Sequence, residues 1–428
     1  MKKAHEDKEK LETLSAIPIF KSEIKDEETV WFESILKNSF RDKEVHRVLS
    51  VDLQSAVPEG TNYSSIIQRA TLKVILRSGR KSTLTVIVKK SHEVKEKSKL
   101  IDDFSLFKAE ILMFSKILTN YEQLMDEYQD HNDKLWCTLI GYQPYNLIVF
   151  EDLKRENYRV ADRTGLLDKL HAQLVLHSLG RFHAMGYVLI NKGLVNEGDL
   201  RPYYLEVDSP VIQNFIAGSL QQLCNVILSG WPTEWTEIGE RLSKQVPVIV
   251  EKLRFFVTEK KNSFVTVCHG DCWTCNMMFK YCPYDENIPV SVKFLDFQCP
   301  HINSYIFDII YFLYVSVQPE VRRSHLNELI SQYQKSLAST LSLYGIEGKA
   351  PTLDHILAEV KRLQYYAMAV NLIYLPITST EVEKAFTLEG LNEGCCGMDA
   401  FNPKIFNTEM FKNSVQSELK RWYNEEIF

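Results

Sequence analysis

The feature that most constrains the fold is a change in hydrophobic periodicity about one third of the way along the chain. Residues 45–90 show the alternation and the β-branched residues of strands, clearest in SSIIQRATLKVIL and STLTVIVKK, which flank a turn at RSGRK. WCTLIGY and YNLIVFEDL predict two further strands. From about residue 160 the spacing is helical, and only FVTVCHGD and VSVKFLDFQ interrupt it as short strands. This order predicts an α+β protein with a β-rich lobe followed by a helical lobe.

Length and composition agree with this fold class. The chain has 428 residues, of which 45% are hydrophobic and 25% charged, as in ordinary globular proteins with room for two cores. The formal charge of −6 provides no basic field for nucleic acid. The N-terminal MKKAHEDKEKLETL lacks the apolar region of a secretory signal, and no uncharged apolar run is long enough to span a membrane. We therefore expect a cytoplasmic protein with reduced cysteines and without nucleic-acid or membrane partners.

The segment CHGDCWTCNMMFKY, which begins at Cys268, concentrates three cysteines and one histidine in eight positions. A structural zinc site needs four ligands, so Cys272 and Cys275 would form one pair, completed by Cys268, His269 or Cys282. No second C-x-x-C lies nearby, and a tryptophan and two methionines fall inside the supposed knuckle. These surroundings argue against zinc.

The oxygen-bearing side chains of this region favour phosphoryl transfer. Asp271 and Asn276 are five positions apart, and Asp296 closes a strand 20 residues further on. In phosphoryl transfer one aspartate takes the proton of the acceptor hydroxyl, while an asparagine five residues later and an aspartate after the next strand hold Mg²⁺. A tight loop between a strand and a helix, followed by a short β-hairpin, would bring the three side chains together. Oxygen ligands suit Mg²⁺ and thiolates do not, so the cysteines become buried filler residues.

Together, HGDCWTCNMMFKY and VSVKFLDFQ resemble the H-G-D-x-W-x-x-N and D-F-Q signatures of the ecdysteroid kinase-like family, also called choline-kinase-like proteins. This family is related to the choline and aminoglycoside phosphotransferases, and the resemblance extends over about residues 40–420. It implies a two-lobed protein-kinase-like fold. Three parts are expected. Residues 1–40 would form an N-terminal helical extension, and residues 41–152 a β-rich lobe that binds the nucleotide. Residues 153–428 would form a helical lobe with the catalytic loop and the acceptor site.

The resemblance also implies residue roles. Asp271, Asn276 and Asp296 would be catalytic, and the last two would bind Mg²⁺. Lys89, at the end of LTVIVKK, would contact the nucleotide phosphates; Lys90 is an equally basic neighbour on the other face of the strand, and the I-V-K pattern of the family favours Lys89.

Glu110 is predicted to pair with that lysine. Helical spacing puts it on the apolar face of LFKAEILMFSKIL, where a carboxylate is costly unless it is paired. Kinases supply this pair as a strand lysine and a helix glutamate.

The remaining nucleotide contacts are expected from two loops. Gly60 and Asn62 lie in the turn PEGTNYSS, whose backbone amides would cover phosphates, although the full G-x-G-x-x-G is absent. LIVFEDL resembles the segment that joins the lobes, where backbone groups of Phe150, Glu151 and Leu153 would hold the edge of adenine.

Three residues are expected to support the site without reacting. His183, on the apolar face of its helix, fits a buried, hydrogen-bonded position. Asp308, within YIFDIIYFLY, matches an aspartate that braces the catalytic loop through backbone amides, and His269 is expected to fix that loop.

The sequence therefore predicts an ATP- and Mg²⁺-dependent small-molecule O-kinase, acting as a monomer. By resemblance its acceptor is a hydrophobic alcohol, such as an ecdysteroid or a xenobiotic, in hormone inactivation or detoxification. The stretches SGWPTEW and YIFDIIYFLYVSV are candidates for the acceptor pocket, although aromatic stretches are more often core. Three alternatives stay open: a nucleotide-binding pseudokinase, a zinc-binding interaction module, and a choline- or ethanolamine-type kinase, for which no pocket of acidic and aromatic residues is recognisable.

Overall fold

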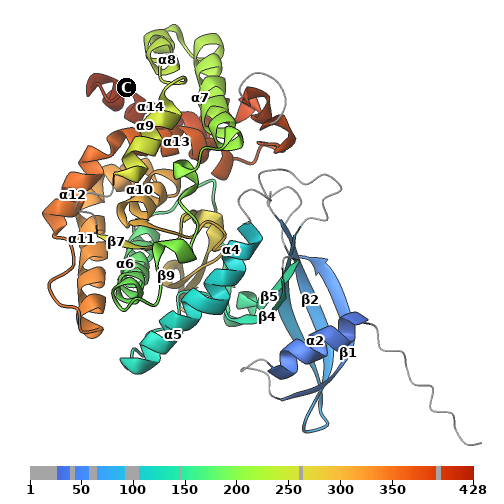
Figure 1. Cartoon of the computed structure of the whole chain (residues 1–428). Coiled ribbons are helices and arrows are strands. Elements are labelled where there is room, and N and C mark those ends of the chain that lie inside the picture. The colour runs from blue at the N-terminus through green and yellow to red at the C-terminus, as the bar shows by residue number, and fades with distance from the viewer. Residues whose placement is uncertain are drawn as a thin grey trace, which may run out of the picture. The chain divides into compact units, whose positions relative to one another are not determined.

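The computed structural model describes residues 27–38, 44–56, 65–91, 106–144, 146–259, 264–391 and 397–428. They form a mixed helix and sheet protein, in agreement with the predicted α+β class (Figure 1). By compactness the chain divides into two units, Met1–Leu53 with Ala70–Leu84, and Gln54–Arg69 with Thr85–Phe428. The two-lobed arrangement, with boundaries near residues 40 and 152, stays a prediction.

The described residues of the first unit form one helix and parts of three strands. Its elements are α2 (Glu27–Asn38), most of β1 (Val45–Ser55), and parts of β2 (Ser65–Leu76) and β3 (Lys81–Ser91). Phe32 and Leu36, four residues apart on α2, are fully buried, as expected for one apolar helix face. The predicted turn between β2 and β3 is present, and Gly79 has the positive φ of +81° that such a turn requires.

The second unit contains all the other elements. The strands are β4 (Leu139–Gln143), β5 (Leu147–Glu151), β6 (Tyr158–Arg159), β7 (Val265–Cys268), β8 (Met277–Cys282), β9 (Asp285–Phe294) and β10 (His301–Ser304). The helices are α4 (Leu106–Leu112), α5 (Leu118–Glu127), α6 (Lys169–Asn191), α7 (Pro210–Gly230), α8 (Thr236–Ser243), α9 (Ile249–Thr258), α10 (Ile306–Val315), α11 (Pro319–Leu343), α12 (Leu353–Arg362), α13 (Gln364–Thr378) and α14 (Glu409–Asn424).

Strand pairing follows the order β1-β2-β3-β5-β4. Within the second unit β3 runs antiparallel to β5, so that Lys89 pairs with Ile148 and Ile87 with Phe150. Four of the five residues of β5 are buried, which explains why its sequence is a continuous apolar run instead of an alternating one.

The expectation that only two short strands follow residue 160 is wrong. The structure adds β8 and β10; β8 forms an antiparallel hairpin with β9, and β10 pairs with β7. Strands β8 and β10 have six and four residues, too few for alternation to stand out from the surrounding apolar sequence.

The predicted helix over DFSLFKAEILMFSKIL is present as α4 and α5, joined by a π-helical turn over Met113–Ile117. Such turns widen a helix locally and are frequent near functional sites. Glu110 lies on α4, within one turn of this irregularity, and its side chain is buried.

The helical core is built around α6, α10 and α11. Helix α6 packs along α11, and all ten residues of α10 are buried. Helix α6 begins at the N-cap Asp168, whose side chain accepts a hydrogen bond from the backbone N–H of His171 at 3.0 Å.

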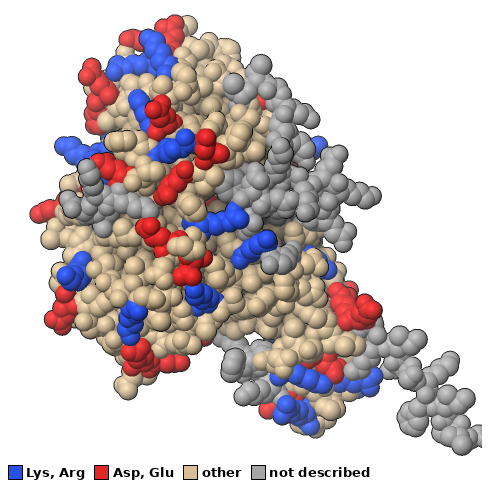
Figure 2. All heavy atoms as spheres, viewed as in Figure 1, with Lys and Arg blue, Asp and Glu red and all other residues tan. Residues whose placement is uncertain are grey.

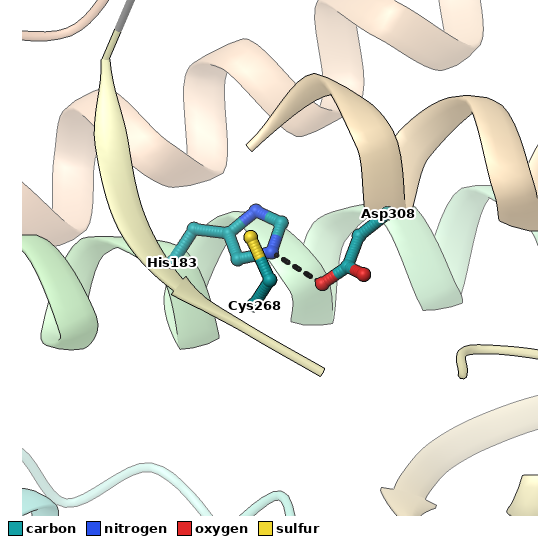
Figure 3. A group of neighbouring side chains, drawn as sticks. All are labelled: His183, Cys268 and Asp308. Atoms are coloured by element: carbon teal, nitrogen blue, oxygen red, sulfur yellow. Dashed lines mark hydrogen bonds and ion pairs between the residues drawn. The ribbon is translucent and has the colours of Figure 1, made fainter. Parts of the chain in front are cut away.

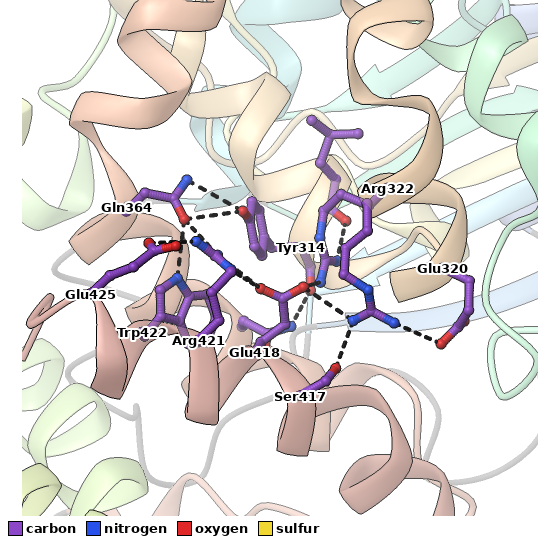
Figure 4. A network of polar contacts seen from close by, with 12 residues as sticks. Tyr314, Glu320, Arg322, Gln364, Ser417, Glu418, Arg421, Trp422 and Glu425 are labelled. Atoms are coloured by element: carbon purple, nitrogen blue, oxygen red, sulfur yellow. Dashed lines mark hydrogen bonds and ion pairs between the residues drawn. The ribbon is translucent and has the colours of Figure 1, made fainter.

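A buried ionic network fastens the C-terminal helix α14 to this core (Figure 4). The carboxylate of Glu418 is 2% exposed and accepts hydrogen bonds from Arg322 at 3.2 Å, Arg323 at 3.3 Å and Arg421 at 2.8 Å. Gln364 of α13 joins the network through Arg421 at 2.7 Å. The network ties α11, α13 and α14 together.

One described helix, α7, is long and apolar enough to cross a membrane, but half of its apolar window is buried inside the protein. Core helices pass the same test of length and composition. On the face drawn in Figure 2, the drawn basic and acidic side chains are interspersed.

Candidate active site

The β8–β9 hairpin brings two of the predicted site residues to one end of its ladder. Met277 pairs with Phe294, and just beyond this pair the backbone N–H of Leu295 donates to the carbonyl of Asn276 at 2.8 Å. Asp296 is the next residue. The expected loop is present, but the expectation that it leads into a helix is wrong, because the chain passes through one 3-10 turn, Thr274–Asn276, directly into β8.

Asp271 is held on both carboxylate oxygens. The side-chain amide of Asn276 donates to Oδ2 of Asp271 and to its backbone carbonyl, both at 2.9 Å. The hydroxyl of Tyr311, on α10, donates to Oδ1 at 2.9 Å. Because the Asn276 nitrogen is committed to Asp271, its Oδ1 oxygen stays available as an acceptor or metal ligand.

The surroundings of Asp271 favour its protonated form more than water does. Burial, together with the nearby carboxylate of Asp296, raises the pKa of Asp271 to about 7, although the hydrogen bonds from Tyr311 and Asn276 act in the opposite direction. A carboxyl group with a pKa near neutrality is suited to accepting and releasing a proton.

Lys89 lies between two carboxylates. Its Nζ contacts Oε2 of Glu110 at 2.6 Å and also Oδ1 of Asp296. Lys89 is 4% exposed and Glu110 is 1% exposed. Burial alone would lower the pKa of the Lys89 ammonium, but the carboxylates of Asp296 and Glu110 raise it, so the side chain stays cationic. Of the two lysines that end β3, Lys89 therefore faces the site, whereas Lys90 is partly exposed.

The backbone at Asp296 is strained. Its φ of +58° lies in the left-handed region, which costs a non-glycine residue about 1–2 kcal/mol. The hydrogen bond from the N–H of Gln298 to the carbonyl of Asp296 at 2.8 Å holds this conformation. Strain of this kind is frequent where a side chain has to be aimed at a ligand.

Asp308 braces the loop that carries Asp271, as expected. Its carboxylate accepts from the backbone N–H of His269 at 2.7 Å and of Gly270 at 2.9 Å, and from Nε2 of His183 at 3.1 Å. Burial opposes the charged form, but the hydrogen bond and charge of His183 outweigh it and lower the pKa of Asp308 to about 2. Gly270 has a φ of +83°, and a Cβ there would lie 2.0 Å from the carbonyl oxygen of Cys299, so this turn needs glycine.

His269 connects the two halves of the site. Its Nε2 donates to the carbonyl of Leu295 at 2.9 Å, and its Nδ1 accepts from the backbone N–H of Asp271 at 3.3 Å. The ring is fully buried, and this burial lowers its pKa, so a neutral imidazole fits both bonds. His269 positions the loop and makes no hydrogen bond to the carboxylate of Asp271.

Among the described residues, His183, Cys268 and Asp308 form one group with metal-ligand spacing, their ligand atoms lying within 4.8 Å of one another (Figure 3). Hydrogen bonds account for this arrangement. Nε2 of His183 faces Asp308, Nδ1 meets the hydroxyl of Tyr333 at 2.9 Å, and Sγ of Cys268 contacts the carbonyl of Ser304 at 3.6 Å. We interpret the group as a structural support.

The thiols of the loop are not gathered as zinc ligands. The group of Figure 3, found within the described part of the chain, includes neither Cys272 nor Cys275. Burial raises the pKa of both thiols, which keeps them protonated and unsuited to metal binding.

The segment predicted to hold adenine has its side chains engaged within the protein. The Glu151 carboxylate accepts from the backbone N–H of Thr138 at 2.9 Å, and Phe150 and Leu153 are buried. The neighbouring Asp152 accepts from Arg69 at 2.7 Å. The backbone N–H of Glu151 donates to the carbonyl of Thr138 at 3.0 Å, and the contacts with adenine stay a prediction. The other two nucleotide candidates, Gly60 and Asn62, lie outside the described residues.

Two features of the site were missed from the sequence, the hydrogen bond of Tyr311 to Asp271 and the contact of Lys89 with Asp296. For Tyr311 a signal existed: it follows Asp308 by three residues on one helix, and residues at that spacing share a face. By contrast, Trp231 and Trp235 of SGWPTEW are 7% and 2% exposed and belong to the core.

One comparison with known proteins, the match to a family model, agrees with the motifs. The model of the ecdysteroid kinase-like family matches residues 59–346. No curated protein gives a significant match. Among solved structures, the chain is similar to a point mutant of aminoglycoside 2'-phosphotransferase-IIIa in its GDP complex, with 10% identity, a TM-score of 0.35, and coverage of 81% of this chain and 96% of that one. Because the family match spans most of the sequence, the resemblance inferred from the motifs is confirmed, and the chain belongs to the ecdysteroid kinase-like family.

Proposed function

We propose that this protein is an ATP- and Mg²⁺-dependent kinase that transfers a phosphoryl group to a hydroxyl of a hydrophobic small molecule. The observation that carries the proposal is one continuous set of contacts. Asp271 bonds to Asn276, Asn276 is tied by its carbonyl to the residue before Asp296, and Asp296 contacts the lysine that Glu110 holds. These are the residue types, in the chain order, that phosphoryl transfer needs.

The donor set fits Mg²⁺. Oδ1 of Asn276 and the carboxylate of Asp296 are hard oxygen ligands on neighbouring residues of one hairpin end. Asn276 and Asp296 would hold Mg²⁺, which when bound would neutralise part of the charge of the nucleotide phosphates.

Lys89 would bind the α- and β-phosphates. An ammonium group has three donor protons, and two of them are directed to Glu110 and Asp296, which leaves one for a phosphate oxygen. Glu110 keeps the side chain extended into the site. The backbone of Phe150, Glu151 and Leu153 would hold adenine.

Asp271 would act as the general base. As the acceptor oxygen attacks the γ-phosphorus and the bond to ADP breaks, the hydroxyl proton passes to the Asp271 carboxylate. The hydrogen bonds from Asn276 and Tyr311 fix the direction of this carboxylate. Positioning and charge neutralisation supply most of the rate enhancement, because the protein forms no covalent bond with the phosphoryl group.

The finer assignments rest on the family. We propose an acceptor of the ecdysteroid type or a xenobiotic alcohol, and a monomeric enzyme that acts in the cytoplasm in hormone inactivation or detoxification. Gly60 and Asn62 are proposed to contact the phosphates.

The test is incubation of the protein with labelled ATP and a panel of ecdysteroids, xenobiotic alcohols, choline and ethanolamine, followed by mass spectrometry of the products. We expect a phosphate ester of a sterol or xenobiotic that forms only with Mg²⁺ and is lost in Asp271→Asn. Nucleotide binding without any ester would indicate the pseudokinase, and an ester of choline or ethanolamine would indicate the other alternative.

A further inference from the structure

Four tyrosine hydroxyls form a row beside the candidate active site. The hydroxyl of Tyr366 lies 2.9 Å from that of Tyr203, Tyr203 donates to Tyr204 at 3.4 Å, and the hydroxyl of Tyr204 lies 2.7 Å from that of Tyr374. Tyr203 and Tyr204 are adjacent in sequence, whereas Tyr366 and Tyr374 both come from α13.

The row has one hydroxyl proton to spare. Because Tyr203 gives its proton to Tyr204, the contact with Tyr366 has to use the proton of Tyr366. The contact between Tyr204 and Tyr374 uses one of their two protons. Within the row, one donor is therefore left over, and it belongs to Tyr204 or Tyr374.

These same two tyrosines are the accessible members of the row. Tyr203 and Tyr366 are 3% and 0% exposed, whereas Tyr204 and Tyr374 are partly exposed. All 15 residues of α13 are buried except Tyr374 and Ile377, which lie three apart and hence on one face. The spare donor is thus on the side of the row that a ligand can reach.

The accessible end of the row adjoins the proposed base. The ring of Tyr374 packs edge-on against that of Tyr311 with centroids 5.4 Å apart, and the Tyr311 hydroxyl donates to Asp271. The ring of Tyr374 also packs against that of Phe215, a partly exposed residue of α7, with centroids 5.5 Å apart. An apolar ring surface with a polar edge therefore begins one side chain away from Asp271.

We infer that Tyr204, Tyr374 and Phe215 form an acceptor-binding strip that selects a largely apolar alcohol with a second hydroxyl besides the reacting one. The inference rests on the proposed function. The carbon skeleton of the acceptor would lie on the rings of Tyr374 and Phe215, with its reacting hydroxyl at Asp271 and its second hydroxyl at the Tyr204–Tyr374 pair. A quaternary ammonium has no lone pair to accept the spare proton, so choline would leave this donor unused.

The test compares Tyr374→Phe and Tyr204→Phe with the wild type, on a polyhydroxylated sterol of the ecdysteroid type and on singly hydroxylated sterols of the same ring skeleton. Tyr365→Phe is the matched control, because it removes a hydroxyl from the same helix, α13, whose partner is Gln245. Each variant keeps its ring, and circular dichroism and Tm check the fold.

We expect each strip variant to raise KM for the polyhydroxylated sterol about five- to tenfold, the size of one hydrogen bond. In the strip variants, three constants should change less than twofold: kcat, the KM for Mg·ATP and the KM for singly hydroxylated sterols. In the control Tyr365→Phe, every one of these constants, and the KM for the polyhydroxylated sterol, should change less than twofold. An unchanged KM for the polyhydroxylated sterol, or an equal rise for both kinds of sterol, would overturn the strip while leaving the kinase assignment intact.

If the wild type forms no ester with any sterol, the kinase assignment fails for this class and the strip is judged by equilibrium binding. Calorimetry with the same polyhydroxylated sterol then decides. Binding by the wild type that weakens five- to tenfold in Tyr374→Phe but not in Tyr365→Phe supports the strip. Absence of binding by the wild type overturns it.

Discussion

Two ionic clusters of the second unit, each built on a buried glutamate, differ in how their charges are balanced. In the network of Figure 4, three arginines, Arg322, Arg323 and Arg421, face three glutamates, Glu320, Glu418 and Glu425. At the candidate active site Lys89 is a single cation beside the carboxylates of Glu110 and Asp296, with Asp271 close to Asp296.

This difference separates a structural cluster from one prepared for a ligand. A buried charge is stable only if it is paired, and the network of α14 pairs its members within the protein. The site has three carboxylates for one ammonium, an excess of two negative charges if all are ionised, which a divalent cation would offset. The raised pKa of Asp271 and the left-handed backbone of Asp296 are further costs at the site.

The largest effect is expected at Asp271. Asp271→Asn removes the proposed base but keeps the shape of the side chain, so we expect kcat to fall by about 10³–10⁴-fold with ATP affinity and fold retained. Steady-state kinetics with the identified acceptor and a nucleotide-binding assay measure this. Asp285→Asn, at an exposed hairpin position, is the control. Nearly full activity of Asp271→Asn would show that another group is the base.

Substitutions in the network of Figure 4 should change the stability of the protein. Glu418→Gln leaves buried guanidinium groups without their carboxylate, so the free energy of unfolding should drop by about 3–5 kcal/mol. Urea unfolding measures it. The control is Glu425→Gln, which replaces a carboxylate that is 49% exposed. Its free energy of unfolding should drop by less than about 1 kcal/mol. A loss of kcat in the folded fraction of Glu418→Gln would contradict a purely structural role.

Asp308 should make the stability of the protein depend on pH in the acidic range. Its folded pKa of about 2 is depressed below the value of about 3.9 for an unfolded chain, so it stabilises the protein by about 2–3 kcal/mol above pH 4, and this contribution disappears as the pH falls toward 2. The stability difference between the wild type and Asp308→Asn should therefore shrink over that range in denaturant titrations. A difference that stays constant from pH 6 to pH 2 would rule out the depressed pKa.

The two lysines at the end of β3 should differ in nucleotide use. Lys89→Met removes the charge that Glu110 and Asp296 hold, and we expect kcat/KM for Mg·ATP to fall about 10–100-fold, the value of a hydrogen bond to a charged group. In Lys90→Met, kcat/KM for Mg·ATP should fall less than twofold. Equal losses in the two variants would remove the reason for assigning the phosphates to Lys89.

The smallest effect is expected at the loop thiols. Cys275→Ser should leave kcat and KM within twofold of the wild type, because a protonated thiol takes no part in oxygen-ligand chemistry. Elemental analysis of the purified protein should find no stoichiometric zinc. Zinc that is present in the wild type and lost in Cys275→Ser would restore the zinc interpretation.

Local patterns predicted the parts of the site that lie within one hairpin or on one face of an element. Asp271, Asn276 and Asp296 could be found because a short loop and a hairpin fix their separation along the chain. Helical spacing and the high cost of burying an unpaired carboxylate predicted that Glu110 has a partner, and the family resemblance indicated Lys89 as that partner. The strands β8 and β10 were missed because they are too short to show a period.

The sequence by itself determined the class of fold, the family and the grouping of Asp271, Asn276 and Asp296, since these depend on residue types at fixed short spacings. Only the tertiary structure decided that Tyr311 holds Asp271, that Lys89 also contacts Asp296, and that Tyr204 meets Tyr374. These partners are separated by 40, 207 and 170 positions in the sequence. Contacts over such separations arise from the packing of whole elements against one another, which no local pattern of residues encodes.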